Sequence, residues 1–187
     1  GFAVGVAKKN KIINGSGIKE GDRLVGLRSS GVHSNGYSLV RKLFPPVKED
    51  LEGFDAELGE SPAQALLRPT RIYVKTILSL IEKHPIKGIA HITGGGFIEN
   101  IPRILPEGLA AKIDRSSYEI PALFKALQRR SGISDEKMYN TFNMGIGMIL
   151  ALPAQQAAQA LEILKAAGEQ AYQIGQVVSG EAGVELV

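Results

Sequence analysis

The spacing of hydrophobic and polar positions predicts strands and helices that follow one another closely along the chain. Short apolar runs, several with a two-residue period, are typical of strands. We place strands at residues 2–6, 23–28, 88–92, 109–114, 141–153, 170–178 and 183–187. The run at 23–28 alternates in polarity, so we expect it to be half-buried or to have an exposed edge.

Apolar stripes at helical spacing predict helices between these strands. We place them at residues 36–44, 61–68, 70–84, 97–105, 121–132 and 154–168. Pro102 should divide the fourth helix into two short pieces. Ser61 before Pro62 is a favoured helix start, and Thr70 can cap the next helix. We expect residues 47–62 to form an irregular acidic connector whose carboxylates are simply solvated.

The strand–helix–strand ending, with other strands and helices before it, indicates an α+β or α/β protein. A length of 187 residues suits one large domain or two small ones, and we predict a single domain over residues 1–187. The chain begins inside a predicted strand, in "GFAVGVA". We therefore expect it to be a fragment of a longer protein.

Composition excludes several classes of function. The chain has no cysteine, which rules out disulfides, thiolate metal sites and cysteine nucleophiles. A net charge of +3 without a basic block argues against nucleic-acid binding. Apolar stretches fall short of the roughly 18 residues that a membrane span needs, and no signal-peptide pattern opens the chain. We expect a cytoplasmic protein.

A run of polar residues follows the strand at 23–28, in "SSGVHSNGYSLV". Ser29, Ser30, Ser34 and Asn35 offer donors and acceptors, and His33 is a histidine, a side chain that ordinarily titrates near neutrality. Such an imidazole can transfer protons or stabilise a developing charge. A capped helix start explains one serine or asparagine but not the whole set, so we favour a functional turn.

Three consecutive glycines, Gly94 to Gly96, follow the strand at 88–92 in "HITGGGFIEN". Their backbone N–H groups are unshielded, and a helix beginning there favours an anion. Thr93 adds a hydroxyl donor. A phosphate-binding loop and a tight turn for close packing are both open, because a lone glycine motif is weak evidence.

Other polar residues carry weaker signals. Asn143 lies in an apolar strand near Gly145 and Gly147, where we favour packing over ligand approach. Arg71 and Lys75 share a helix face and could receive an acidic group. We expect His91 to be a core residue. No metal-ligand spacing is present, so we predict no metal site.

Four longer motifs together resemble one known family. They are "GLRSSGVHSNGYSLVRK", "LLRPTRIYVK", "HITGGGFIENIPR" and "MYNTFNMGIGM". In order and approximate spacing they resemble the C-terminal half of phosphoribosylformylglycinamidine cyclo-ligases, also called AIR synthetases. The resemblance spans most of residues 24–148.

The resemblance implies a function in purine biosynthesis. The family uses ATP to activate the formyl-derived amide oxygen of formylglycinamidine ribonucleotide, and ring closure then gives aminoimidazole ribonucleotide, ADP and phosphate. It also implies a layered α/β/α domain whose mixed sheet has partial ferredoxin-like topology. The family's N-terminal domain, which dimerises and binds ATP and Mg²⁺, is absent here. The complete enzyme is expected to be a homodimer, and this chain alone should be inactive.

The resemblance also assigns site residues as hypotheses. His33 becomes the candidate for acid–base or charge-stabilising work, and Gly94, Gly95 and Gly96 become a phosphate loop. The remaining predicted substrate- or phosphate-binding residues are Ser30, Gly31, Ser34, Asn35, Thr93, Asn100, Arg103 and Asn143.

Two alternatives stay open. A sister enzyme of the same ATP-using superfamily, a synthetase or kinase, would share the fold but act on another substrate. A folded domain that binds a ligand or partner without turnover would lack the ATP and metal groups, as this chain does. We also expect the polar residues after the strand at 23–28 and the three glycines at 94–96 to surround one opening. We call it the shared mouth, and a single nucleotide-sized ligand should contact both sides of it.

Overall fold

A computed structural model describes residue 2 and residues 4–187. The described strands are β1 (Arg23–Arg28), β2 (Gly88–His91), β3 (Leu109–Ile113), β4 (Ile146–Leu152), β5 (Ala171–Ser179) and β6 (Val184–Leu186). The α-helices are α1 (Tyr37–Leu43), α2 (Lys48–Glu52), α3 (Pro62–Leu66), α4 (Val74–Ile81), α5 (Gly96–Asn100), α6 (Ala122–Ser131), α7 (Asp135–Thr141) and α8 (Ala154–Ala166). Short 3-10 turns lie at η1 (Lys9–Lys11) and η2 (Pro102–Ile104).

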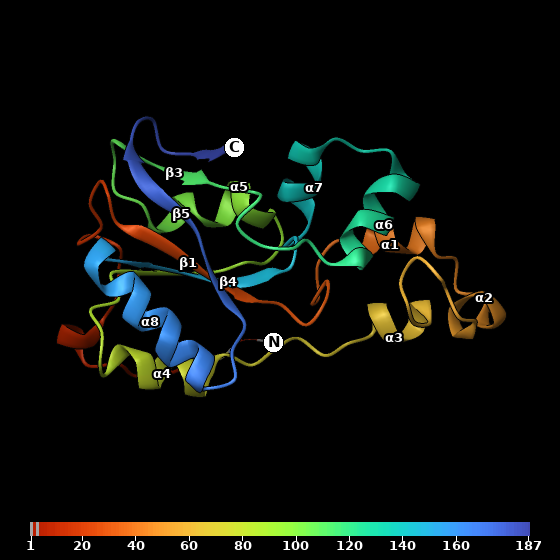
Figure 1. Cartoon of the computed structure of the whole chain (residues 1–187), viewed down its shortest axis with the longest axis horizontal. Coiled ribbons are helices and arrows are strands. Elements are labelled where there is room, and N and C mark those ends of the chain that lie inside the picture. The colour runs from red at the N-terminus through yellow and green to blue at the C-terminus, as the bar shows by residue number, and fades with distance from the viewer. Residues whose placement is uncertain (1, 3) are drawn as a thin grey trace.

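The strands form one mixed sheet in the order β2-β4-β1-β5-β3-β6 (Figure 1). Strands β4 and β5 both pair antiparallel with β1 and are joined through α8. This arrangement is a split β-α-β unit, the element that ferredoxin-like folds share. Strand β6 pairs parallel with β3, which makes the sheet mixed. The predicted α+β class and mixed sheet are confirmed.

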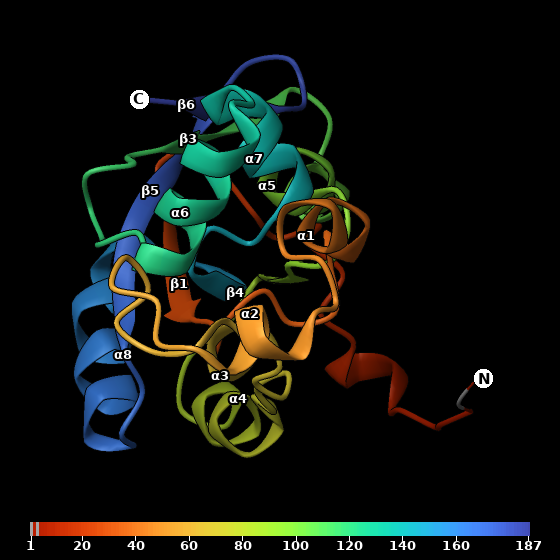
Figure 2. The same cartoon turned by 90° about the vertical axis from the view of Figure 1, so that its right-hand side faces the viewer.

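Helices cover both faces of the sheet, so the layered α/β/α arrangement is also confirmed (Figures 1 and 2). Helices α4 and α8 pack on one face over Val25, Leu27 and Leu150. Helices α1, α5, α6 and α7 contribute to a second core on the other face, which contains Leu24 and Ile146. Burying apolar surface on both faces is the main stabilising contribution in such a domain.

Strand β1 lies at the centre of the sheet, which corrects the expectation of a half-buried strand. Its four middle residues are all buried. Gly26 packs closely against β4, because a Cβ there would lie 2.8 Å from a methyl group of Ile146. The small residue in this strand therefore reflects close packing rather than exposure to water.

Several other expectations differ from the structure. The described part of the strand predicted at 2–6 has no regular structure, and Phe2, Val4 and Val6 are exposed; Gly1 and Ala3 lie outside the described residues. Tyr73, not Thr70, is the N-cap residue of α4 and makes no capping side-chain bond. Helices α2 and α7 were not predicted. Ser61 does cap α3, through a bond from the N–H of Gln64.

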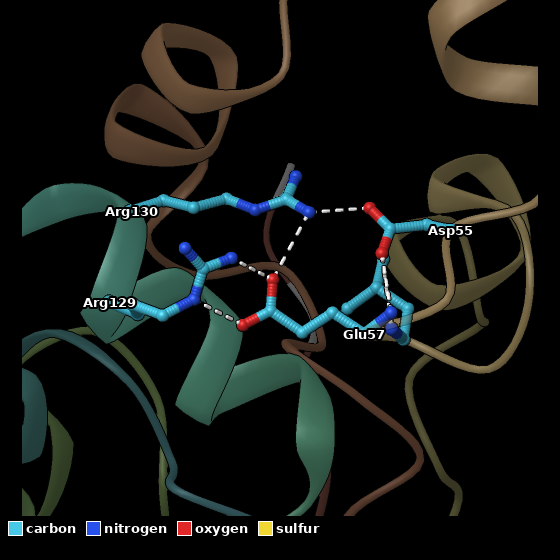
Figure 3. Close-up of polar contacts among 5 residues, drawn as sticks. Asp55, Glu57, Arg129 and Arg130 are labelled. Atoms are coloured by element: carbon cyan, nitrogen blue, oxygen red, sulfur yellow. Dashed lines mark hydrogen bonds and ion pairs between the residues drawn. The ribbon is translucent and has the colours of Figure 1, made fainter.

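The acidic connector is held to α6 by ion pairs of Asp55 and Glu57, so these two carboxylates are not simply solvated, whereas Glu49 and Asp50 are exposed as expected (Figure 3). Arg130 pairs with Asp55 at 2.5 Å, and the guanidinium of Arg129 donates to Glu57 at 2.6 Å. The hydrogen bond from Arg130 holds the pKa of Asp55 below its ordinary value. The guanidinium of Arg130 also lies 4.5 Å from the centre of the Phe44 ring. These contacts fix the connector that leads to the site.

Candidate functional site

The polar turn, residues 29–36, connects the central strand β1 to α1 and lies at one end of the sheet. Its first residue extends the sheet, because the N–H of Ser29 donates to the carbonyl of Gly145 at 2.8 Å. The turn then needs left-handed backbone: His33 has a φ of 56°. Only a residue whose surroundings hold it firmly keeps that conformation at modest cost.

Asn143 holds the polar turn in place through hydrogen bonds of its side chain. Its Oδ1 accepts from the hydroxyl of Ser29 and from the N–H of Gly145, both at 2.9 Å. Its Nδ2 donates to the carbonyl of Gly31 at 2.8 Å. The side chain is 1% exposed. Both amide atoms of Asn143 are therefore engaged in joining the polar turn to the residue before β4. Contact between Asn143 and a ligand stays a prediction.

His33 is buried and points into the protein. Its Nε2 accepts from the N–H of Ser30 at 3.2 Å, so at neutral pH its proton is carried by Nδ1. Nδ1 has no hydrogen-bond partner among the described residues. Burial lowers the pKa of His33 from 6.5 to about 4, with smaller contributions from the charges of His91 and Arg71. The imidazole is thus neutral at physiological pH, although its residue type suggested titration near neutrality.

Tyr73 and Gly147 make the floor under His33. A Cβ on Gly147 would lie 2.2 Å from the Tyr73 hydroxyl oxygen and 2.6 Å from Cε1 of His33. The Tyr73 hydroxyl donates to the carbonyl of Arg28 at 2.9 Å. Only glycine leaves room for both rings against β4, which agrees with the packing role favoured for Gly147. Tyr73 was not singled out by sequence, because a tyrosine on a helix stripe is ordinarily core.

The segment between α3 and α4 lies against the polar turn. The hydroxyl of Ser30 donates to the carbonyl of Pro69 at 2.6 Å, and the hydroxyls of Ser34 and Thr70 lie 3.3 Å apart. This segment is thus hydrogen-bonded to the polar turn, while the ion pairs in Figure 3 hold the preceding connector to α6.

The glycine loop, residues 93–96, leads from β2 into α5 and is organised by Asn100. Nδ2 of Asn100 donates to the carbonyls of Gly94 and Gly96 at 3.1 and 2.7 Å. Its Oδ1 accepts from the Thr93 hydroxyl at 3.1 Å. Gly95 has a φ of 89°, which favours glycine. Gly96 packs on α7, where a Cβ would lie 2.0 Å from the Tyr139 carbonyl oxygen. Close packing therefore explains Gly96, while Gly94 is exposed.

The polar turn and the glycine loop lie side by side. A Cβ on Gly94 would lie 3.6 Å from Oδ1 of Asn35. The N–H of Ile92, just before the loop, donates to the carbonyl of Gly147 at 2.9 Å, and Gly147 is the residue on which the His33 ring rests. The structure therefore brings the imidazole and the three glycines to the same end of the sheet, as one shared mouth requires.

Glu99 adds a negative charge beside the loop that the sequence did not reveal. Its carboxylate carbon lies 2.5 Å from the position of a Cβ on Gly95. Arg103 lies 3.7 Å from that carboxylate and also donates to Oδ1 of Asn100 at 3.1 Å. Both charged side chains are largely exposed. The pair places one cation and one anion at the rim of the loop, within reach of any anion that binds there.

Burial divides the predicted site residues into two groups. Those accessible to a ligand, exposed or half-buried, are Ser30, Ser34, Asn35, Thr93, Gly94, Gly95 and Arg103. The buried ones are Gly31, His33, Gly96, Asn100 and Asn143. The first group can contact a ligand directly, whereas the second group holds the two loops in place.

The other two histidines lie in different surroundings. His91 is exposed at the end of β2, so the expectation of a core histidine is wrong. His84 is buried, and its Nδ1 lies 3.0 Å from Oε1 of Gln156. Within the described part of the chain, no three His, Cys, Asp or Glu side chains are grouped to hold a metal ion. No described helix is long and apolar enough to cross a membrane.

Curated relatives share this sequence over its whole length. The phosphoribosylformylglycinamidine cyclo-ligase of Acetivibrio thermocellus is 55% identical over 186 residues, which are 100% of this chain and 55% of that protein. The cyclo-ligase of Agathobacter rectalis is 47% identical, with the same coverage of each chain. The chain spans about half the length of the curated relatives it matches.

Solved structures show the same fold at low sequence identity. The thiamine-monophosphate kinase of Stenotrophomonas maltophilia matches with a TM-score of 0.66 and 15% identity over 96% of this chain and 54% of that chain. HypE of E. coli, a hydrogenase maturation protein, matches with a TM-score of 0.60 and 21% identity over 92% of this chain and 47% of that chain. At such identities the likeness concerns the fold alone.

The sequence also matches the family described as AIR synthase related protein, C-terminal domain, over residues 19–187. That range includes every strand of the described residues, both loops of the shared mouth and all the predicted site residues. This chain belongs to the family of AIR synthase related proteins, in which it is the C-terminal domain.

Proposed function

We propose that this chain is the substrate- and phosphate-binding half of an ATP-dependent phosphoribosylformylglycinamidine cyclo-ligase. The observation that carries the proposal is 55% identity to such a cyclo-ligase along the entire chain. The complete enzyme would convert formylglycinamidine ribonucleotide and ATP to aminoimidazole ribonucleotide, ADP and phosphate. This is a step of purine biosynthesis, and we place the enzyme in the cytoplasm.

The shared mouth has the chemistry to hold an anionic nucleotide. The exposed loop at Gly94 presents backbone N–H groups, and Thr93, Ser34 and Asn35 offer polar side chains around it. Arg103 supplies a cation at the rim. We propose that a phosphate of the substrate or of ATP occupies the glycine loop and that the polar turn contacts the formyl and amidine groups.

His33 would act as a neutral group in this proposal. Its Nε2 is already bonded to the N–H of Ser30, and burial keeps the ring uncharged at pH 7. The unpartnered Nδ1–H is buried in this structure, so we propose that substrate binding exposes it and that it then donates to an oxygen on which negative charge develops. We therefore favour charge stabilisation over general acid catalysis for His33, with Ser30 positioned by the same ring.

The residues of this chain do not fit a Mg²⁺ site. Magnesium prefers carboxylate and phosphate oxygens, and the mouth offers mainly amide, hydroxyl and imidazole groups. Glu99 is the one carboxylate that the described contacts place beside the glycine loop, and it lies near Arg103. We propose that ATP and Mg²⁺ are bound mainly by the N-terminal half of the complete enzyme, which we expect to be a homodimer.

A chimera tests this function. The residues of the Acetivibrio thermocellus cyclo-ligase that lie outside the match would be joined to this chain in their natural order. We expect ATP-dependent cyclisation by the chimera and none by the 187-residue chain alone. Activity of the lone chain would show that the ATP site has been misplaced, and an inactive but folded chimera would contradict the assigned substrate. His33→Ala in the active chimera should lower turnover more than threefold.

A further inference from the structure

An apolar surface lies on α4 and the residues just before it, next to Tyr73, which packs against His33. Ile72, Val74 and Leu78 are 82%, 59% and 58% exposed. They surround a pocket of about 350 Å³ that also reaches Tyr73, His91 and Met148. We call Ile72, Val74 and Leu78, with this pocket, the α4 patch.

The α4 patch departs from the pattern of a surface helix. Ile77 and Leu80 already form the buried stripe of α4, so the opposite face should be polar. Val74 and Leu78 instead lie one helical turn apart on the outside. Single exposed apolar residues are normal, but a group around a hollow is typical of an interaction surface.

The patch adjoins an open edge of the sheet. Strand β2 is the outermost strand, and its last residue, His91, lines the pocket. An uncovered edge strand beside apolar side chains is a place where another polypeptide adds by backbone pairing and side-chain burial. Ile72 lines the pocket but is 82% exposed, so a small ligand inside the pocket would cover only part of its side chain.

The chain's own N-terminal segment leaves the domain at this edge. The N–H of Gly15 donates to the carbonyl of Lys87, immediately before β2, at 3.1 Å. From there the segment extends away from the body (Figure 2), with Phe2, Val4 and Val6 exposed. Fourteen residues span at most about 45 Å, so any polypeptide joined to them stays within reach of the patch. The relatives are about twice as long as this chain.

We propose that the α4 patch is the docking surface for the polypeptide that precedes this domain in the longer cyclo-ligase relatives. The proposal rests on the proposed function, because that function requires the other half. It adds the surface on which the two halves meet: Ile72, Val74 and Leu78 become buried, and the open edge of β2 is covered.

Cysteine labelling tests the docking directly, because the chain has no cysteine of its own. Leu78→Cys would be introduced in the 187-residue chain and in the chimera, with Glu162→Cys on the exposed side of α8 as the matched control. Modification by N-ethylmaleimide is followed at each site by peptide mass spectrometry. We expect labelling at position 78 to slow at least tenfold in the chimera relative to the slowing at position 162. A ratio below threefold overturns the proposal.

Two further results would also overturn it. If labelling at position 78 slows in the lone chain as its concentration rises, a second copy covers the patch instead. If Leu78→Glu lowers the urea midpoint of the lone chain as much as Ile77→Glu does, the patch belongs to the chain's own core. Neither readout uses turnover. A protected patch in an inactive chimera would therefore uphold the docking surface while removing the proposed function.

Discussion

The buried imidazole of His33 should lower the free energy of unfolding in acid. Replacing this one residue should abolish that acid-dependent loss. His33→Asn takes away the titrating ring, and asparagine tolerates the positive φ of 56° at this position better than most residues. The variant loses the bond from the N–H of Ser30 and the packing against Gly147, so at pH 7 it should be less stable than the wild type by about 1–2 kcal/mol.

The pH dependence has a defined sign. The folded pKa of His33 is about 4 and its ordinary value is 6.5, so the unfolded chain takes up the proton first as the pH falls. The wild type therefore loses stability below pH 6.5, and the loss is complete near pH 4. The two pKa values correspond to about 3 kcal/mol between pH 7 and pH 4. His33→Asn escapes this loss, so the order of stability should reverse in acid.

Urea unfolding of both proteins at several pH values between 7 and 4 measures this difference. All other titrating groups are shared, so they cancel in the comparison. His91→Asn serves as the control, because His91 is exposed and only adds a secondary contribution to the lowered pKa of His33, so its curve should differ from that of the wild type far less than the curve of His33→Asn does. A stability difference between wild type and His33→Asn that stays constant within about 0.5 kcal/mol over this range would refute a buried, neutral His33.

Three further predictions concern Asn143, Gly147 and Glu99. Asn143→Ala should cost about 2–4 kcal/mol of unfolding free energy, because the buried hydroxyl of Ser29 and buried backbone groups of Gly31 and Gly145 lose their partner, whereas Asn140→Ala should cost less than about 1 kcal/mol; chemical denaturation compares them. Gly147→Ala should cost about 2–3 kcal/mol, because its Cβ would lie 2.2 Å from the Tyr73 hydroxyl oxygen. Gly17→Ala, whose Cβ meets nothing nearer than 3.9 Å, should cost far less, and equal effects would contradict the packing of His33 and Tyr73 over β4. Glu99→Gln should tighten binding of inorganic phosphate about threefold to tenfold by removing a like charge beside the loop. Unchanged affinity by titration calorimetry, or weaker binding, would place the anion elsewhere.

The regular elements could be predicted where one local signal dominates. Proline and glycine bound α6 and α8 in the sequence, and Ser61 with Pro62 marks the start of α3. The strand predicted at residues 2–6 is wrong, because the described residues of this segment pair with no strand of the domain. Helix α7 escaped prediction because its polar sequence, "DEKMYNT", buries only Met138 and Tyr139.

The residue types of the site could be predicted from the sequence. Which of them are accessible to a ligand, and which hold the loops in place, could not. The family resemblance assigned Asn100 and Asn143 to the site, yet only the structure shows that their amides bind loop carbonyls. The neutral state of His33 depends on burial against Tyr73 and Gly147, which lie far away in sequence. Long-range contacts of this kind leave no local pattern, and the same holds for the pairing of Arg130 with Asp55.

The central claim is that the polar turn and the glycine loop hold one ligand together. Backbone amide resonances of the isotopically labelled chain, followed while formylglycinamidine ribonucleotide is added, test this most directly. The account predicts that Ser34 and Asn35 shift together with Gly94 and Gly95, along one saturation curve with one dissociation constant. Shifts confined to one of the two segments, or saturation of a different surface while both remain unmoved, would contradict it.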